Sequence, residues 1–149
     1  MAPLIALLVG SLTARLAGFL GLAALDGWQP ALRIGLALMF LLTGYAHFAA
    51  PRRNGLIAMV PPALPRPALL VTVTGVLELA GVVGLLVPAT ARWTAAGLAL
   101  LMLAMFPANV SAARRGLTLG GRPVTPLGIR TAIQVVFLAA ALLVLLLPA

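Results

Sequence analysis

Apolar residues dominate five stretches of the chain, and short segments rich in polar residues, proline or glycine separate them. A window of about 19 residues is the length over which a transmembrane helix is recognised. Because a helix rises ~1.5 Å per residue, each stretch is long enough to cross a hydrocarbon core of ~30 Å. The pattern therefore predicts five membrane-spanning helices, at residues 3–25, 31–50, 67–88, 91–113 and 126–148.

The composition supports this assignment and excludes other classes of protein. Hydrophobic residues make up 63% of the 149 residues and charged residues only 8%, whereas charged residues make up ~25% of an ordinary soluble domain. Ten basic and two acidic side chains are too few to cover a water-facing surface of this size. We therefore expect an all-α membrane protein formed by a single transmembrane domain.

The arginines predict the orientation of the helices. All ten basic residues are arginines, with three in loop 51–66, three in loop 114–125, and only Arg33 and Arg92 beside the remaining loops. Because positive charge accumulates in cytoplasmic loops, loops 51–66 and 114–125 are expected on the cytoplasmic side. Arginines scattered between apolar stretches do not form the basic face that a nucleic acid needs, so we expect no nucleic-acid partner.

The first stretch is unusual because Arg15 lies at its centre. An isolated arginine at that depth costs ~2.5–3.5 kcal/mol on insertion scales. A signal peptide is the alternative, but no basic residue precedes the apolar run, so we expect a retained helix that is tilted or partly interfacial. Arg15 and Glu78 would be opposite charges at the membrane centre, which predicts contact between the first and third helices.

Polar side chains inside the predicted spans are the candidates for a binding site. Glu78 lies at the middle of residues 67–88, where a carboxylate needs a partner or a proton. Other polar residues lie near the cytoplasmic ends of separate helices and therefore share a similar depth. The candidate ligand-binding residues are His47, Glu78, Asn109, Gln134, Arg130, Tyr45 and Met59, and the candidates for catalysis are Glu78 and His47.

Each polar candidate also has a structural interpretation. Asn109 and Gln134 are suited to hydrogen bonds between helices, and the long side chain of Arg130 can reach the membrane interface. A single histidine such as His47 can serve a binding site or simply donate to a backbone carbonyl. Glu78 is the residue for which the pattern favours function over structure, because intramembrane acids are functional by default.

Small residues form narrow faces on two of the predicted helices. Gly75 and Gly81 flank Glu78, and Gly10 and Gly18 lie along the first helix. Such faces let another helix approach closely. They are compatible with contact between copies of the chain in a homo-oligomer and equally with packing inside one copy.

Residues 51–66 form a segment that is too apolar for a free loop but too short and rich in proline to span the membrane. We expect it to lie in the interface or to dip back as a lid, with Leu56, Met59 and Leu64 among the residues that face lipid or protein. The lid would cover the depth at which His47, Asn109 and Gln134 converge. This arrangement suits a flat, lipophilic ligand.

These motifs together resemble the DoxX family of small bacterial membrane proteins. The resemblance covers residues 33–145 and rests on Gly44-x-x-His47-Phe48, Met59-Val60-Pro61-Pro62, Thr74-Gly75-x-x-Glu78 and Phe106-Pro107-Ala108-Asn109. It implies a four-helix transmembrane bundle formed by the second to fifth spans, with the first span as an extra N-terminal helix. It also implies the bacterial cytoplasmic (inner) membrane as the location, and His47, Glu78 and Asn109 as site residues.

Proteins related to DoxX are associated with redox chemistry, among them a subunit of a thiosulfate:quinone oxidoreductase. The resemblance therefore implies a quinone as ligand and redox-complex subunits as partners. Thiol-dependent members of the family are not a guide here, because the chain has no cysteine. Our leading hypothesis is a redox-associated accessory protein that binds a quinone or another lipophile between its helices.

Two other functions fit the same residues. A membrane enzyme would use Glu78 and His47 as an acid/base pair, and a proton-coupled transporter would use Glu78 as its proton site. The sequence shows no inverted repeat of the kind that many transporters contain. With one histidine, two acids and no cysteine, we expect no metal site, and we expect membrane lipid and a lipophilic small molecule as partners.

Overall fold

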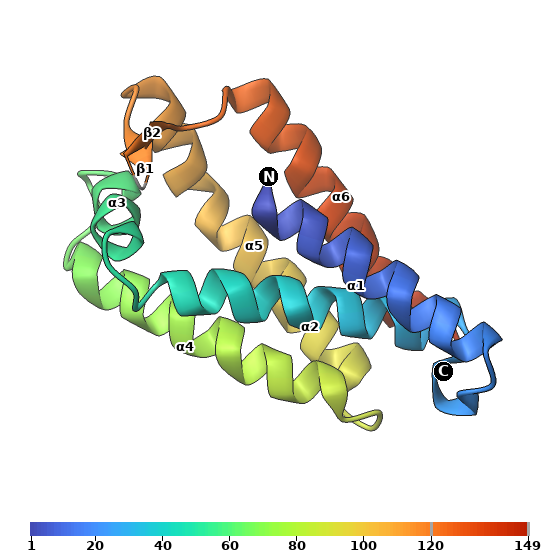
Figure 1. Ribbon diagram of the computed structural model, residues 1–149. Helices are drawn as coiled ribbons and strands as arrows, with labels where there is room; N and C mark the ends of the chain where they lie inside the picture. Colours follow the sequence, from blue (N-terminus) through green and yellow to red (C-terminus); the bar gives the residue numbers. More distant parts are fainter. Residues whose placement is uncertain (120, 149) are drawn as a thin grey trace.

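The computed structural model describes residues 1–119 and 121–148, which are almost entirely helical (Figure 1). The α-helices of this part of the chain are α1 (Ala2–Phe19), α2 (Trp28–Ala46), α3 (Arg52–Met59), α4 (Pro67–Leu86), α5 (Ala91–Arg114) and α6 (Leu127–Leu146). A 3₁₀ turn at Ala23–Leu25 follows α1, and strands β1 (Thr118–Leu119) and β2 (Arg122–Pro123) form a hairpin before α6. Helices α1, α4, α5 and α6 are long and apolar enough to cross a membrane. The prediction of an all-α membrane protein is confirmed.

Helix α2 lies between the other long helices and packs against α1, α4 and α6. Although a span was predicted at residues 31–50, α2 is not among the four helices of the described residues that are long and apolar enough to cross a membrane. Its first turns carry Gln29 and Arg33. Both of these side chains are buried. Because neighbouring helices cover Gln29 and Arg33, these two polar side chains are shielded from lipid, where unpaired polar groups are costly.

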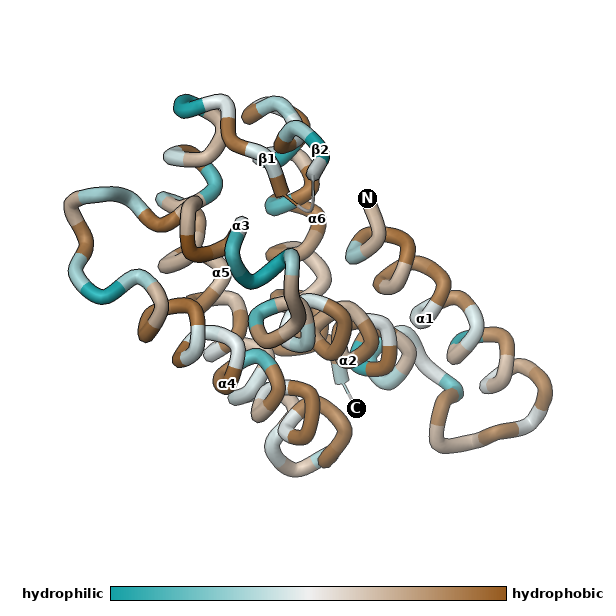
Figure 2. The backbone as a smooth tube through the Cα atoms, turned by 60° about the vertical axis from the view of Figure 1, so that its left-hand side comes forward, coloured by the Kyte–Doolittle hydropathy of each residue, from teal (hydrophilic) through white to brown (hydrophobic). Residues whose placement is uncertain are grey.

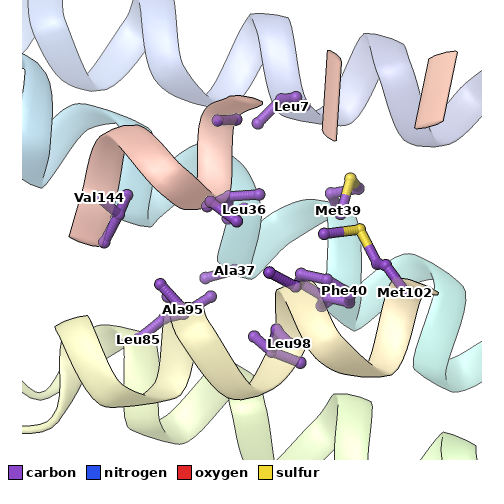
Figure 3. Packing of buried hydrophobic residues seen from close by; sticks show 13 residues of the cluster. Leu7, Leu36, Ala37, Met39, Phe40, Leu85, Ala95, Leu98, Met102 and Val144 are labelled. Carbon is purple, nitrogen blue, oxygen red and sulfur yellow. The ribbon is translucent and has the colours of Figure 1, made fainter. Parts of the chain in front are cut away.

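The core lies where α2 meets its neighbours, and Figure 3 shows its side chains from close by. The central residues are Leu36, Ala37 and Phe40 of α2, packed with Leu7 of α1, Leu85 of α4, Leu98 of α5 and Val144 of α6. In a membrane, lipid tails are as apolar as these side chains, so close packing rather than transfer from water holds the helices together. Helix α1 contributes to this core and is part of the bundle.

Glycines mark the closest helix crossings. A Cβ atom added to Gly35 of α2 would lie 2.0 Å from the Ser11 hydroxyl oxygen on α1. A Cβ on Gly75 of α4 would lie 2.5 Å from the Cβ of His47, and one on Gly81 would meet α5 at 2.6 Å. Such short separations leave room only for hydrogen. These narrow faces therefore serve packing inside one copy of the chain.

The predicted contact between Arg15 and Glu78 is wrong. Helix α1 ends at Phe19, well before the predicted end at residue 25, so Arg15 lies near the end of its helix. The chain then turns back, and the Arg15 guanidinium donates to Oδ1 of Asp26 at 3.0 Å. The same guanidinium lies 3.8 Å from the centre of the Phe19 ring. Arg15 thus finds a partner nearby in sequence, because the helix is shorter than the apolar stretch.

We expect the Arg15–Asp26 ion pair to contribute little to stability, because 63% of the Asp26 side chain is exposed. A double-mutant cycle with Arg15→Met and Asp26→Asn should give a coupling energy below about 1 kcal/mol. The measurement is the free energy of unfolding during titration with sodium dodecyl sulfate. A parallel cycle with Arg15→Met and Glu78→Gln should be additive, and coupling above about 1 kcal/mol in that cycle would contradict the structure.

Candidate functional site in a cavity between the helices

A cavity of about 570 Å³ lies between α2, α4 and α5, at the end of the molecule that also carries α3 and the hairpin. Its lining is mostly apolar and comes from the first residues of α1, the C-terminal half of α2, α3, the α3–α4 loop, α4, α5 and β1. The polar side chains of the lining are those of Thr43, His47, Arg52, Thr74, Glu78 and Asn109. A mostly apolar cavity of this size with a few convergent polar groups is typical of small-molecule sites.

The polar wall of the cavity is built around Glu78, which is only 2% exposed. The hydroxyl group of Thr43 donates to Oε2 of Glu78 at 2.6 Å. Nδ1 of His47 lies 2.8 Å from the backbone carbonyl oxygen of Thr43 and 3.8 Å from Oε2 of Glu78. The second separation is too long for a hydrogen bond. Thr43 therefore connects the two candidate residues, through its hydroxyl group on one side and its carbonyl on the other.

Two glycines explain why His47 and Glu78 come together. Gly75 of α4 lies against His47, and a Cβ built on Gly44 of α2 would lie 3.4 Å from the Cβ of Glu78. Each helix thus presents a glycine to the candidate residue of the other helix. Because the backbones approach closely at such positions, the imidazole and the carboxyl group share one wall of the cavity.

Helix α3 covers the cavity, and arginines hold it at both ends. Arg53 donates to the carbonyl oxygen of His47 at 2.7 Å and to the Thr72 hydroxyl oxygen at 2.9 Å, which connects α3 to α2 and α4. Arg115, just after α5, donates to the carbonyl oxygens of Ala58 and Val60. A cation beside free carbonyl groups at a helix end is favourable. The segment predicted as an interfacial or re-entrant lid therefore contains a short helix fixed to three others.

The sequence candidates divide into two groups in the structure. His47, Glu78, Asn109 and Met59 line the cavity, and Met59 is 4% exposed. The remaining three candidates, Tyr45, Arg130 and Gln134, are not among the lining residues in the described part of the chain.

The three candidates outside the cavity have other environments. Tyr45 is 66% exposed. Gln134 of α6 donates to the carbonyl oxygen of Met102 on α5 at 2.9 Å. Arg130 of α6 donates to Oδ1 of Asn109. Gln134 and Arg130 thus link α6 to α5. For Gln134 this agrees with its structural interpretation, a hydrogen bond between helices.

Thr43 is the residue that the sequence analysis missed. It lies one helical turn before His47, and residues at this spacing are neighbours on a helix surface. That spacing was a usable signal, but threonines also bond to their own helix backbone, so the signal was not specific. Arg52 at the start of α3 was not expected in the site either, because residues 51–66 were predicted as an interfacial or re-entrant segment and not as a helix.

The fold and the cavity define an all-α membrane protein with an internal, mostly apolar cavity. A family model described as a domain of unknown function (DUF8561) matches residues 36–145, and the chain belongs to this family. The matched region contains the polar wall of the cavity, whereas α1 lies outside it. No curated protein matches the chain, and no solved structure matches it.

Proposed function

We propose that the protein binds a quinone, or a similar lipophile with a polar ring, in the cavity between α2, α4 and α5. The observation that carries this proposal is the cavity of about 570 Å³, which is mostly apolar and has one polar wall formed by Thr43, His47 and Glu78. An apolar lining suits an alkyl chain and a ring, and a few fixed polar groups orient a headgroup.

The cover over the cavity supports the same function. Leu56 and Met59 of α3 and Leu64 of the following loop add apolar surface to the lining. Because Arg53 and Arg115 fix α3 on both sides, the cover is part of the folded structure. A preformed site loses little conformational entropy when its ligand binds.

We propose a redox-associated accessory role for this binding, in the bacterial cytoplasmic membrane. The support is the resemblance of the His47, Glu78 and Asn109 motifs to the DoxX family, which also points to redox-complex subunits as partners. The arginines support an orientation with residues 51–66 and 114–125 on the cytoplasmic side. Both segments lie at the same end of the molecule. Figure 2 shows hydrophilic residues in α3, in the following loop and near the hairpin.

The test is ligand-dependent stability of the purified protein in detergent. A short-chain ubiquinone analogue at about 100 times its Kd should raise the free energy of unfolding by about 2.7 kcal/mol. An alkane of the same chain length should have a much smaller effect, because it cannot use the polar wall. The measurement is the unfolding midpoint as a function of ligand concentration.

Two phenylalanine variants make this test specific for the cavity. Ala108→Phe places a ring in the cavity from α5, whereas Ala80→Phe places the same ring on an exposed position of α4. Stabilisation by the quinone analogue should disappear in the first variant and persist in the second. Equal stabilisation of both variants, or none of the unsubstituted protein, would overturn the proposal.

A further inference from the structure

The two hydroxyl groups that line the cavity, those of Thr43 and Thr74, donate their hydrogen bonds to other groups of the protein. The Thr43 hydroxyl group donates to Glu78 at 2.6 Å. The Thr74 hydroxyl group lies 3.0 Å from the carbonyl oxygen of Leu70 and 3.1 Å from that of Val71, and donates to the helix backbone. Neither threonine therefore has a proton left to offer a ligand in the cavity.

The proton on the His47 ring is also used. Nδ1 lies 2.8 Å from the carbonyl oxygen of Thr43, and a carbonyl oxygen can only accept a hydrogen bond. Nδ1 must therefore carry the proton. In the neutral imidazole, the other ring nitrogen, Nε2, is then an acceptor.

Glu78 presents an acceptor when it is ionised, and also when it is protonated on Oε2. An ionised carboxylate accepts the Thr43 hydroxyl proton at Oε2 and leaves Oε1 as a further acceptor. A carboxyl group protonated on Oε2 donates to the Thr43 oxygen, and the Thr43 proton can then turn to the carbonyl oxygen of Phe40 at 3.4 Å. In both cases Oε1 lacks a proton and accepts. A proton on Oε1 would instead make this atom a donor, so Nε2 of His47 is the acceptor that does not depend on the state of Glu78.

Both free acceptors remain accessible from the cavity. Among the described residues, neither Nε2 of His47 nor Oε1 of Glu78 takes part in a hydrogen bond. The polar side-chain atoms that are sealed and unpartnered in that part of the chain belong to Ser11, Arg15 and Gln29, and not to this wall. Two acceptors without a donor from the protein, in residues that are 7% and 2% exposed, can each take a hydrogen bond from the headgroup of a ligand.

From this arrangement we propose that the cavity takes a lipophile whose headgroup donates a hydrogen bond, such as a phenol or a hydroquinone, in preference to one that only accepts. This inference rests on the proposed binding function and names the chemical class of its ligand. The headgroup hydroxyl donates to Nε2 of His47, or to Oε1 of Glu78 when that atom carries no proton. Arg52 and Asn109 also line the cavity and can donate to an oxygen of either form of a quinone. Only the reduced form can also donate to His47 or Glu78, so the protein favours the reduced form over the oxidised form.

The first test is the protonation of the histidine ring. His47 is the only histidine in the chain, so ¹⁵N-histidine labelling gives one pair of ring signals in a magnetic resonance spectrum. The expected result is a protonated Nδ1 and an unprotonated Nε2, with the Nε2 signal shifting when a long-chain para-alkylphenol is added. A proton on Nε2, in the neutral or the charged ring, would overturn the proposal.

The second test compares the para-alkylphenol with its methyl ether, which has the same chain and ring but no donor. One hydrogen bond is expected to favour the phenol by about two- to tenfold in Kd. A hydroquinone should be preferred over its quinone in the same direction, under anaerobic conditions. An ether that binds as tightly as the phenol would overturn the proposal.

Variants assign this preference to the polar wall. His47→Phe should reduce or remove the preference for the phenol, whereas Tyr45→Phe removes an exposed hydroxyl group outside the cavity and should leave it unchanged. An unchanged preference in both His47→Phe and Glu78→Leu would overturn the proposal.

If the quinone, the phenol and the ether all fail to bind, the proposed function itself fails. If they bind without discrimination, only the present inference fails.

Discussion

Replacing Arg33 with methionine is expected to lower the free energy of unfolding by about 2–4 kcal/mol, because two charge-assisted hydrogen bonds are lost. Nε of Arg33 donates to the carbonyl oxygen of Leu85 at 2.8 Å, and a terminal nitrogen donates to that of Leu86 at 3.0 Å. The last carbonyl groups of a helix have no partner within it. Without Arg33 these carbonyl groups at the end of α4 remain unpaired in an apolar setting, which is costly.

Arg92→Met is the matched control for this prediction. Arg92 also donates to a backbone carbonyl oxygen at a helix end, that of Leu147 at 2.9 Å, but this contact is exposed. Because water or lipid headgroups can replace an exposed donor, the loss of stability should be much smaller. The measurement for both variants is unfolding by sodium dodecyl sulfate. Equal losses in the two variants would show that burial of the Arg33 contacts is unimportant.

Gly75→Ala is expected to cost about 1–3 kcal/mol of stability, because an added methyl group overfills a close crossing. Its Cβ would lie 2.5 Å from the Cβ of His47 and 2.9 Å from the ring of Phe48. Both neighbours sit at the end of α2, so α2 must move away from α4. Since this movement displaces His47 from the cavity wall, the affinity for the quinone analogue should fall by about tenfold, the effect of 1.4 kcal/mol.

Gly97→Ala controls for the general effect of adding a methyl group to a helix. Gly97 lies within α5, and a Cβ built there meets no atom within 4 Å beyond its chain neighbours and the adjacent backbone of its own helix. Alanine is a better helix former than glycine, so stability should be unchanged or slightly higher and ligand affinity should be unchanged. Unchanged stability and affinity in Gly75→Ala would contradict the close crossing between α2 and α4.

The positions of the long helices were largely predictable from the sequence. A segment in lipid must satisfy its own backbone hydrogen bonds, so a long apolar stretch becomes a helix whatever its neighbours are. Pro67 at the start of α4 and Pro126 before α6 are local signals of the same kind. The least accurate boundary was the end of α1. Apolar residues continue after Phe19 there, but the chain already turns.

The candidate site was predictable only in part. A carboxyl group at Glu78 and an imidazole at His47 stand out because polar residues are rare in apolar helices. The role of Thr43 could not be read from the sequence, because its hydroxyl group meets Glu78 only when α2 and α4 cross at Gly44 and Gly75. Gln134 looked similar to Asn109 in sequence, yet its partner is the backbone of α5.

The sequence by itself determined that this is an all-α membrane protein, and which residues carry rare polar groups into its helices. Hydropathy and helix length are properties of each segment alone, so they can be read without knowing the fold. Only the tertiary structure decided the partners of those polar groups, such as Asp26 for Arg15 and Thr43 for Glu78. The rotation and depth of each helix depend on how small residues pack against neighbouring helices, and these contacts join residues far apart in the chain.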